Sequence, residues 1–153
     1  MKKYIYVILS LILLFGLTGC SSKKVISPKK FMSITKNYKL TVDDISSHFK
    51  DVKQIKSAVI SESDDLWKME YYVFDSNDSA KDMYERNLQF YNDNKANCKS
   101  ADDKSTKNLD EFTLVDEEYY MYVCRNKNSL IYVYAPANNK TDVEKILRAL
   151  KYK

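Results

Sequence analysis

Two pairs of apolar, strand-like segments constrain the fold of this 153-residue chain more than any other feature. Residues 55–61 (IKSAVIS) and 66–74 (LWKMEYYVF) flank one polar turn, and residues 118–124 (EYYMYVC) and 130–135 (LIYVYA) flank another. Strand-like runs separated by a short polar turn are typical of a β-hairpin. The two pairs therefore predict two hairpins of an antiparallel sheet.

Segments with a helical spacing of apolar residues surround these hairpins. They cover residues 28–36, about 76–92 and about 141–150. Residues 111–115 (EFTLV) predict one more strand, and the polar residues 92–110 are expected to form a loop. The order helix, hairpin, helix, strand, hairpin, helix predicts an α+β domain, with an antiparallel sheet of about five strands packed on one face by about three helices.

The first 19 residues are typical of a secretory signal peptide. Lys2 and Lys3 form a basic start, and an uncharged, mainly apolar run of 16 residues follows from Tyr4 to Gly19. A helix that spans a bilayer needs about 20 apolar residues. The run is therefore short for a membrane span and fits a signal peptide.

Cys20 ends this run in the sequence LTGC, which resembles the lipobox of bacterial lipoproteins. In that family a lipid is attached to the cysteine thiol and a peptidase cuts just before it, so the resemblance implies lipid attachment at Cys20. Two or more acyl chains hold a protein durably on a membrane, at about 0.8 kcal/mol per buried methylene. The alternatives are an uncleaved anchor and an ordinary secretory peptide whose cysteine is incidental.

The lipobox divides the chain into a signal peptide (1–19), a lipidated cysteine with a flexible basic tether (20–27) and one α+β domain (28–153). It predicts a protein anchored by lipid on the extracytoplasmic side of the cell membrane. Six of the 25 basic residues precede Phe31 and all 21 acidic residues follow it, which leaves a net charge of −2 from Phe31 onward. Tether lysines favour anionic headgroups, and the lack of a basic stripe in the domain argues against nucleic acid as a partner.

The other two cysteines, Cys98 and Cys124, lie in a chain that is expected to be exported. An even pair in an oxidising compartment predicts one disulfide. The alternative is two thiols, because some exported bacterial proteins never meet an efficient oxidase. Two cysteines 26 residues apart lack the paired spacing of a zinc site.

No pattern in the sequence indicates a catalytic or metal site. His48 is the only histidine, and no nucleophile stands at a recognised spacing from it. Residues 75–82 (DSNDSAKD) look like part of a calcium loop but lack the glycine and the final glutamate of an EF-hand, so they predict a helix N-terminus. We therefore expect a protein that is not an enzyme and has no catalytic residues, metal or cofactor.

Tyrosine is unusually abundant, with 13 residues in the chain. Several of these tyrosines fall on predicted strands, where neighbouring residues face opposite sides of the sheet. An exposed set would suit a protein or glycan partner, because tyrosine combines a large contact area with a polar tip. The candidate surface consists of Tyr72, Tyr120, Tyr122, Tyr132 and Tyr134. The alternative is that β-propensity and AT-rich codon usage alone explain the abundance.

Four segments resemble a family of small lipoproteins of low-GC Gram-positive bacteria. They read SPKKFMSITKNY, KLTVDDIS, YYVFDSNDSAKDMYERN and LIYVYAPANNKTDVEKILRALKY. The resemblance implies location and fold and supplies no activity. The leading expectation is a lipid-anchored, non-enzymatic domain that binds an envelope protein or glycan. The alternative is a small-ligand carrier or sensor with a pocket between helices and sheet, lined by tyrosines and Trp67.

Overall fold

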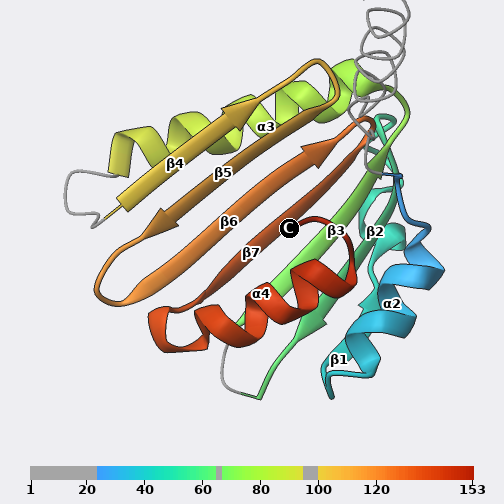
Figure 1. Cartoon of the computed structure of the whole chain (residues 1–153). Coiled ribbons are helices and arrows are strands. Elements are labelled where there is room, and N and C mark those ends of the chain that lie inside the picture. Colours follow the sequence, from blue (N-terminus) through green and yellow to red (C-terminus); the bar gives the residue numbers. More distant parts are fainter. Residues whose placement is uncertain (1–23, 65–66, 95–99) are drawn as a thin grey trace, which may run out of the picture.

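The computed structural model describes residues 24–64, 67–94 and 100–153, and within them one antiparallel sheet has seven strands in the order β1-β2-β3-β7-β6-β5-β4 (Figure 1). The strands are β1 (Thr41–Asp44), β2 (Ile55–Glu62), β3 (Lys68–Phe74), β4 (Ser100–Ser105), β5 (Leu109–Val115), β6 (Tyr119–Asn126) and β7 (Ser129–Pro136). The helices are α2 (Pro28–Lys36), α3 (Asn77–Asn94) and α4 (Lys140–Ala149), with short 3-10 helices η1 (Ser46–Phe49) and η3 (Ala137–Asn139).

The α+β class and both hairpins are confirmed, but the prediction of about five strands was wrong. The sheet gains β1 and β4 at its two edges. The strand β4 lies inside residues 92–110, which we expected to be a loop. All six of its residues are exposed, and β4 joins the sheet by backbone pairing with β5. A strand that buries no side chains has no apolar alternation, so sequence periodicity cannot reveal it.

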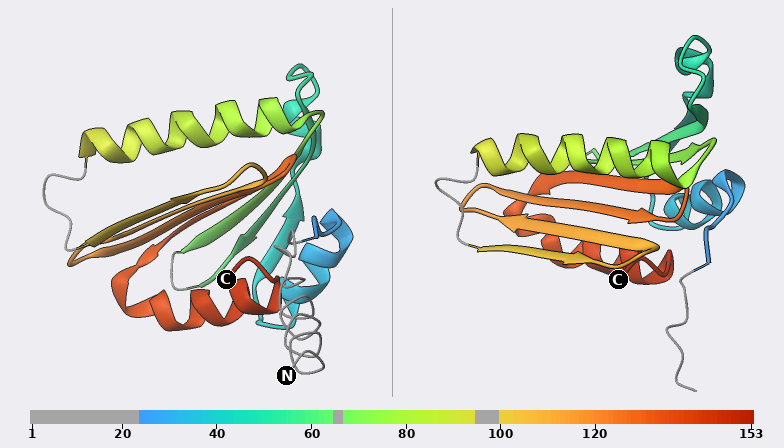
Figure 2. Two further views of the ribbon diagram at one scale, coloured as in Figure 1. Left: turned by 45° about the horizontal axis from the view of Figure 1, so that its top comes forward. Right: turned by 90° about the horizontal axis from the view of Figure 1, so that it is seen from above.

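The prediction that the helices pack on one face was also wrong, because they cover both faces (Figure 2). Helices α2 and α4 lie on one face over a core that contains Phe31, Tyr71 and Leu147. Helix α3 lies on the other face over a second core that contains Phe112 and Val123. The central strands carry apolar residues at consecutive positions, and a sheet of this kind needs a cover on each side.

Local signals placed the helices well. Ser27 caps α2, its side chain accepting a hydrogen bond from Lys30 N at 3.2 Å, and the helix spans the predicted residues 28–36. At the start of α3, Ser76 Oγ accepts from Ser79 N at 3.1 Å, which confirms that residues 75–82 begin a helix. Among the described residues, no helix is long and apolar enough to cross a membrane.

Buried tyrosine hydroxyls tie both ends of the described chain to the sheet. On β6, Tyr122 donates to the carbonyl oxygen of Tyr152 at 2.7 Å, and the Tyr152 hydroxyl lies 2.8 Å from Ser129 Oγ on β7. On β3, Tyr71 donates to the carbonyl oxygen of Ile26 at 2.6 Å. Burial raises the pKa of the Tyr71 and Tyr152 hydroxyls, so both remain neutral donors at physiological pH.

Candidate binding pocket

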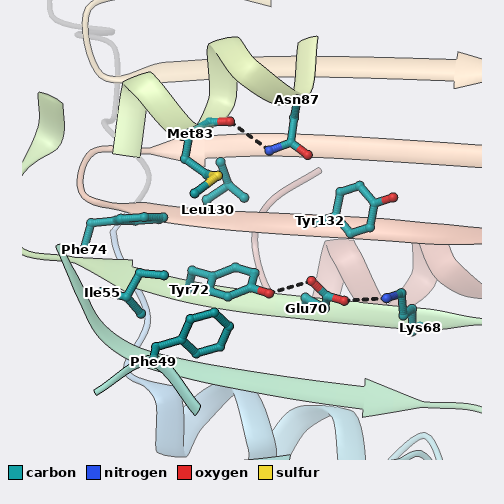
Figure 3. Close-up of a pocket in the computed structure, with 10 residues that line it drawn as sticks. All are labelled: Phe49, Ile55, Lys68, Glu70, Tyr72, Phe74, Met83, Asn87, Leu130 and Tyr132. Carbon is teal, nitrogen blue, oxygen red and sulfur yellow. Dashed lines mark hydrogen bonds and ion pairs between the residues drawn. The ribbon is translucent and has the colours of Figure 1, made fainter. Parts of the chain in front are cut away.

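A pocket of about 230 Å³ lies between helix α3 and the sheet, on the face opposite α2 and α4 (Figure 3). Seven of its lining side chains are apolar or aromatic, and three are polar. They are Phe49, Ile55, Tyr72, Phe74, Met83, Leu130 and Tyr132, with Lys68, Glu70 and Asn87. The pocket thus combines an aromatic wall with a small polar region, which is the usual composition of a ligand site.

The strand β3 supplies one wall through alternate residues. Its side chains at positions 68, 70, 72 and 74 all face α3, because successive strand residues point to opposite faces. The neighbouring strand β7 continues the wall, with Tyr132 paired to Glu70 and Leu130 paired to Tyr72. The ring of Phe49 closes one side and lies edge-on to Tyr72, with ring centroids 5.7 Å apart.

A polar row runs along β3 at one side of the pocket. Glu70 accepts from the Tyr72 hydroxyl at 2.6 Å through one oxygen and binds Lys68 Nζ at 2.7 Å through the other (Figure 3). Burial and the Glu70 carboxylate raise the pKa of Tyr72, while the bond to Glu70 raises the pKa of Lys68. At neutral pH Tyr72 is therefore a neutral phenol and Lys68 an ammonium group, one on each side of Glu70. The Lys68 ammonium group has three N–H donors, so it can donate to another acceptor while one N–H binds Glu70.

The pocket has a buried floor and partly exposed walls. Phe74 and Leu130 are 2% and 1% exposed, whereas Phe49, Tyr72 and Tyr132 are half-buried. When a ligand covers apolar surface, the binding free energy improves by about 25 cal/mol for each Å² that is removed from water. The walls can therefore contribute binding free energy without a rearrangement of the floor.

The structure divides the predicted tyrosine surface between the two faces of the sheet. Tyr72 and Tyr132 line the pocket, and Tyr134 lies on the same face, stacked on Tyr119 with ring centroids 4.9 Å apart. Burial and the contact with Tyr119 raise the pKa of Tyr134 to about 12. Tyr120 and Tyr122 belong to the opposite core and are fully buried, so they cannot contribute to a binding surface.

Trp67 was expected to line the pocket and does not. It is 4% exposed and packs in the core beneath α2 and α4. Lys68 and Glu70 line the pocket although they were not predicted to do so. Their signal was present in the segment LWKMEYYVF, where positions 68, 70, 72 and 74 alternate with the buried positions of the other face. On this face of the strand, the charged pair Lys68 and Glu70 comes first and the aromatic residues Tyr72 and Phe74 follow. This order indicates a surface that is polar at one end and apolar at the other.

The predicted cysteine sites are only partly within the described residues. Cys20 and Cys98 lie outside them. Cys124 is fully buried on β6, where it pairs with Glu111, and Glu111 in turn pairs with Lys104 on β4. The disulfide stays a prediction.

His48 lies exposed in η1, at the end of the sheet. Within residues 24–64, 67–94 and 100–153, no group of three or more histidine, cysteine, aspartate or glutamate side chains is arranged to hold a metal ion. His48 is also absent from the lining of the pocket. The pocket is therefore the feature of the described chain that best fits a binding role.

A scan against models of protein families finds no match, and a search of curated proteins finds none either. Among solved structures, the crystal structure of a GTP-binding regulator from Thermotoga maritima is similar, at 14% sequence identity and a TM-score of 0.48. The match covers 82% of this chain and 84% of that chain. The fold and pocket define a small α+β domain with an aromatic cavity on one sheet face.

Proposed function

We propose that this protein is a lipid-anchored, non-enzymatic binding protein of the cell envelope whose pocket takes a small ligand. The observation that carries the ligand-binding role is the aromatic pocket beside the row Lys68, Glu70 and Tyr72. The residues that line the pocket include no histidine, cysteine or serine, and both Glu70 oxygens are occupied. This composition favours binding over acid–base or nucleophilic chemistry.

The pocket favours a small planar ligand that carries a hydrogen-bond acceptor. Its volume of about 230 Å³ lies below that of drug-sized sites, which hold about 300–1,000 Å³. Aromatic walls at Phe49, Tyr72 and Tyr132 suit a ring, since stacked or edge-on aromatic contacts add about 0.5–1.5 kcal/mol beyond area burial. The ammonium group of Lys68 can donate to an acceptor on that ring.

Small aromatic acids and amides should stabilise the protein, and filling the pocket should abolish the effect. We expect benzoate, phenylacetate or benzamide to raise the melting temperature, because a ligand at 100 times its Kd adds about 2.7 kcal/mol to stability. The substitution Met83→Trp places a larger side chain at the pocket wall and should weaken binding by at least about tenfold. Thermal shift and calorimetric titration measure both effects.

The matched control is Gln89→Trp, which adds the same side chain at an exposed position of α3. It should bind like the natural protein. If none of the three probes stabilises the natural protein, or if Met83→Trp binds as well as Gln89→Trp does, the ligand-binding role is wrong.

The proposed anchor is supported by the LTGC sequence and by the short chain between Cys20 and the folded domain. Replacing Cys20 with alanine removes the thiol that would carry the lipid, so we expect the protein to appear in the medium or as an unprocessed precursor. Membrane fractionation and intact mass measure this outcome. Ser21→Ala is the control and should stay membrane-bound. Unchanged fractionation and mass of Cys20→Ala would contradict lipid anchoring.

A further inference from the structure

The hairpin turns at opposite ends of the sheet carry opposite charge. The turns β2–β3 and β5–β6 lie at one end, and their described acidic residues are Asp64, Asp116, Glu117 and Glu118. The connections β1–β2, β4–β5 and β6–β7 lie at the other end, and their lysines are Lys50, Lys53, Lys107 and Lys127. Three exposed aspartates at this end, Asp51, Asp75 and Asp78, only partly offset these four cations.

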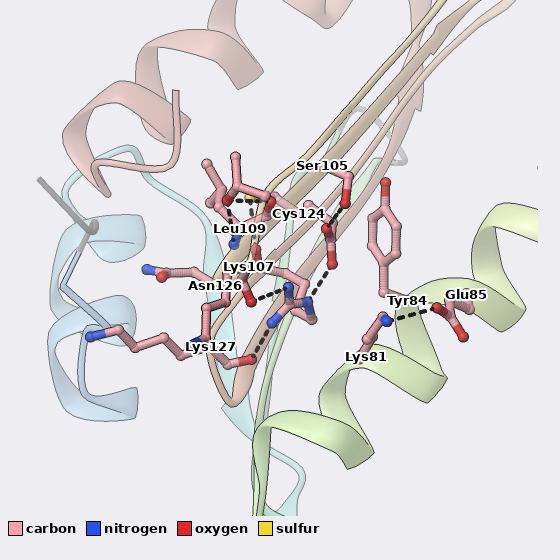
Figure 4. Close-up of polar contacts among 12 residues, drawn as sticks. Lys81, Tyr84, Glu85, Ser105, Lys107, Leu109, Cys124, Asn126 and Lys127 are labelled. Atoms are coloured by element: carbon pink, nitrogen blue, oxygen red, sulfur yellow. Dashed lines mark hydrogen bonds and ion pairs between the residues drawn. The ribbon is translucent and has the colours of Figure 1, made fainter. Parts of the chain in front are cut away.

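Hydrogen bonds join two of the basic turns into one surface. Lys127 N donates to Asn108 O at 2.7 Å. The buried Arg125 donates to the carbonyl oxygens of Lys127 at 3.3 Å and Lys107 at 3.4 Å, so one guanidinium holds both turns (Figure 4). These bonds therefore hold the backbones of the two turns next to each other.

The β1–β2 connection joins the same surface through the end of β3. Gln54 O accepts from Asp75 N at 2.8 Å, and Asn128 O accepts from Phe74 N at 2.8 Å. Residues 45–54, 106–108 and 127–128 thus lie at the same end of the sheet (Figure 1), and in Figure 2 the β1–β2 connection projects past α3, away from the β4–β5 turn. Residues that are distant in sequence form this basic surface only because the strands alternate in direction.

The chain also enters the domain at this end. The blue segment that begins at Lys24 runs into α2 at the same end of the sheet as the β1–β2 connection (Figure 1) but on the opposite face (Figure 2), and the Tyr71 hydroxyl donates to the carbonyl oxygen of Ile26. Lys24, Lys29 and Lys30 are exposed. Ile26 lies six positions after Cys20, and since each step spans at most about 3.6 Å, Ile26 lies within roughly 20 Å of Cys20.

We propose that this basic end, formed by Lys24, Lys29, Lys30, Lys50, Lys53, Lys107 and Lys127, lies against the anionic lipid headgroups of the membrane that anchors the chain. The inference rests on the proposed anchoring, which keeps the basic end close to the bilayer. Electrostatic attraction acts over about 8 Å at physiological ionic strength, so lysines that lie close to the membrane surface can respond to it. The acidic turns lie at the far end, away from the same negative surface.

Lysine reactivity in vesicles tests this orientation in the natural chain. The full chain is reconstituted into phosphatidylcholine vesicles with or without phosphatidylglycerol, and a membrane-impermeant acetylating reagent modifies its lysines. We expect acetylation of Lys50, Lys53, Lys107 and Lys127 to slow by at least about threefold in the anionic vesicles, and 1 M salt to abolish the difference. Lys36, Lys39 and Lys145 should react at the same rate in both, as peptide mass spectrometry would show.

Two variants separate the loop lysines from the tether lysines. Replacing Lys50, Lys53, Lys107 and Lys127 with glutamine should reduce the protection of Lys29 and Lys30, because the domain loses its preferred orientation. The matched variant replaces Lys36, Lys39, Lys145 and Lys151 with glutamine and should keep that protection. Equal protection of Lys29 and Lys30 in the two variants would overturn the proposal.

Further outcomes are also decisive. Equal reactivity of the basic end in neutral and anionic vesicles would overturn the proposal, and so would protection by soluble polyphosphate without protection by anionic lipid. Either the lipid or the apolar N-terminal segment would hold the reconstituted chain, so the orientation is measured whatever the state of Cys20. Intact mass of the same sample reports lipidation, which distinguishes failure of the anchor from failure of the orientation.

Discussion

Replacing Asp110 with alanine is expected to lower the free energy of unfolding by about 3–5 kcal/mol, which is the cost of leaving a buried charge without its partner. Asp110 forms an ion pair with Arg125, and the two side chains are only 4% and 3% exposed. Ser105 Oγ also donates to Asp110 Oδ1. Denaturant unfolding of the purified protein measures the change.

The geometry around Arg125 explains why the effect should be large. Its guanidinium also donates to the carbonyl oxygens of Lys107 and Lys127, so it cannot turn toward water without breaking the contacts that join two turns (Figure 4). Removing the carboxylate therefore leaves a buried positive charge without its counter-ion. Desolvation of such a charge costs several kcal/mol.

Two controls separate charge burial from other losses. Asp102 and Lys104 form an ion pair whose side chains are 65% and 66% exposed, so Asp102→Ala should change stability by less than about 0.5 kcal/mol. The double substitution Asp110→Leu with Arg125→Met removes both charges and should cost less than Asp110→Ala alone. If Asp110→Ala costs no more than Asp102→Ala, the pair does not stabilise the fold as described.

Replacing Phe31 with alanine should destabilise the protein by about 3–5 kcal/mol, the usual cost of deleting a fully buried aromatic side chain. Phe31 is completely buried and stacks on Tyr71, with ring centroids 5.0 Å apart. It holds α2 on the sheet, close to the point where Tyr71 binds Ile26. Thermal or denaturant unfolding measures the loss, and limited proteolysis shows whether α2 detaches first.

The matched control is Ser33→Ala, an exposed position of the same helix, which should be neutral within about 0.5 kcal/mol. Tyr71→Phe keeps the stacked ring and removes the hydroxyl that binds Ile26, so it should cost about 1 kcal/mol. A loss for Phe31→Ala no greater than that for Ser33→Ala would show that α2 contributes little to the core.

Much of the secondary structure could be predicted because its signals are local. The cap at Ser27 with Pro28 fixed the start of α2, and Ser76 fixed the start of α3. The alternation in LWKMEYYVF identified β3. Each of these signals depends on residues within one or two turns of the chain, and neighbours in sequence are enough to generate it.

The pocket could be predicted only as a possibility, because its walls come from separate elements. The row Lys68, Glu70 and Tyr72 is visible on one strand, but the Phe49 ring reaches it from η1 and Met83 from α3. Tyr72 and Tyr122 look alike in sequence, and only the packing of α3 and α4 on opposite faces leaves one half-exposed and the other buried.

The sequence by itself determined the α+β class, the two hairpins, the bounds of α2 and the expectation of a lipid anchor at Cys20. Only the tertiary structure decided the two edge strands, the two-sided cover of the sheet, the pocket and the gathering of Lys50, Lys107 and Lys127 at the end where the chain enters. The reason is physical: propensity and periodicity act between neighbours in the chain, whereas strand order and helix docking depend on contacts between distant residues, which no local pattern specifies.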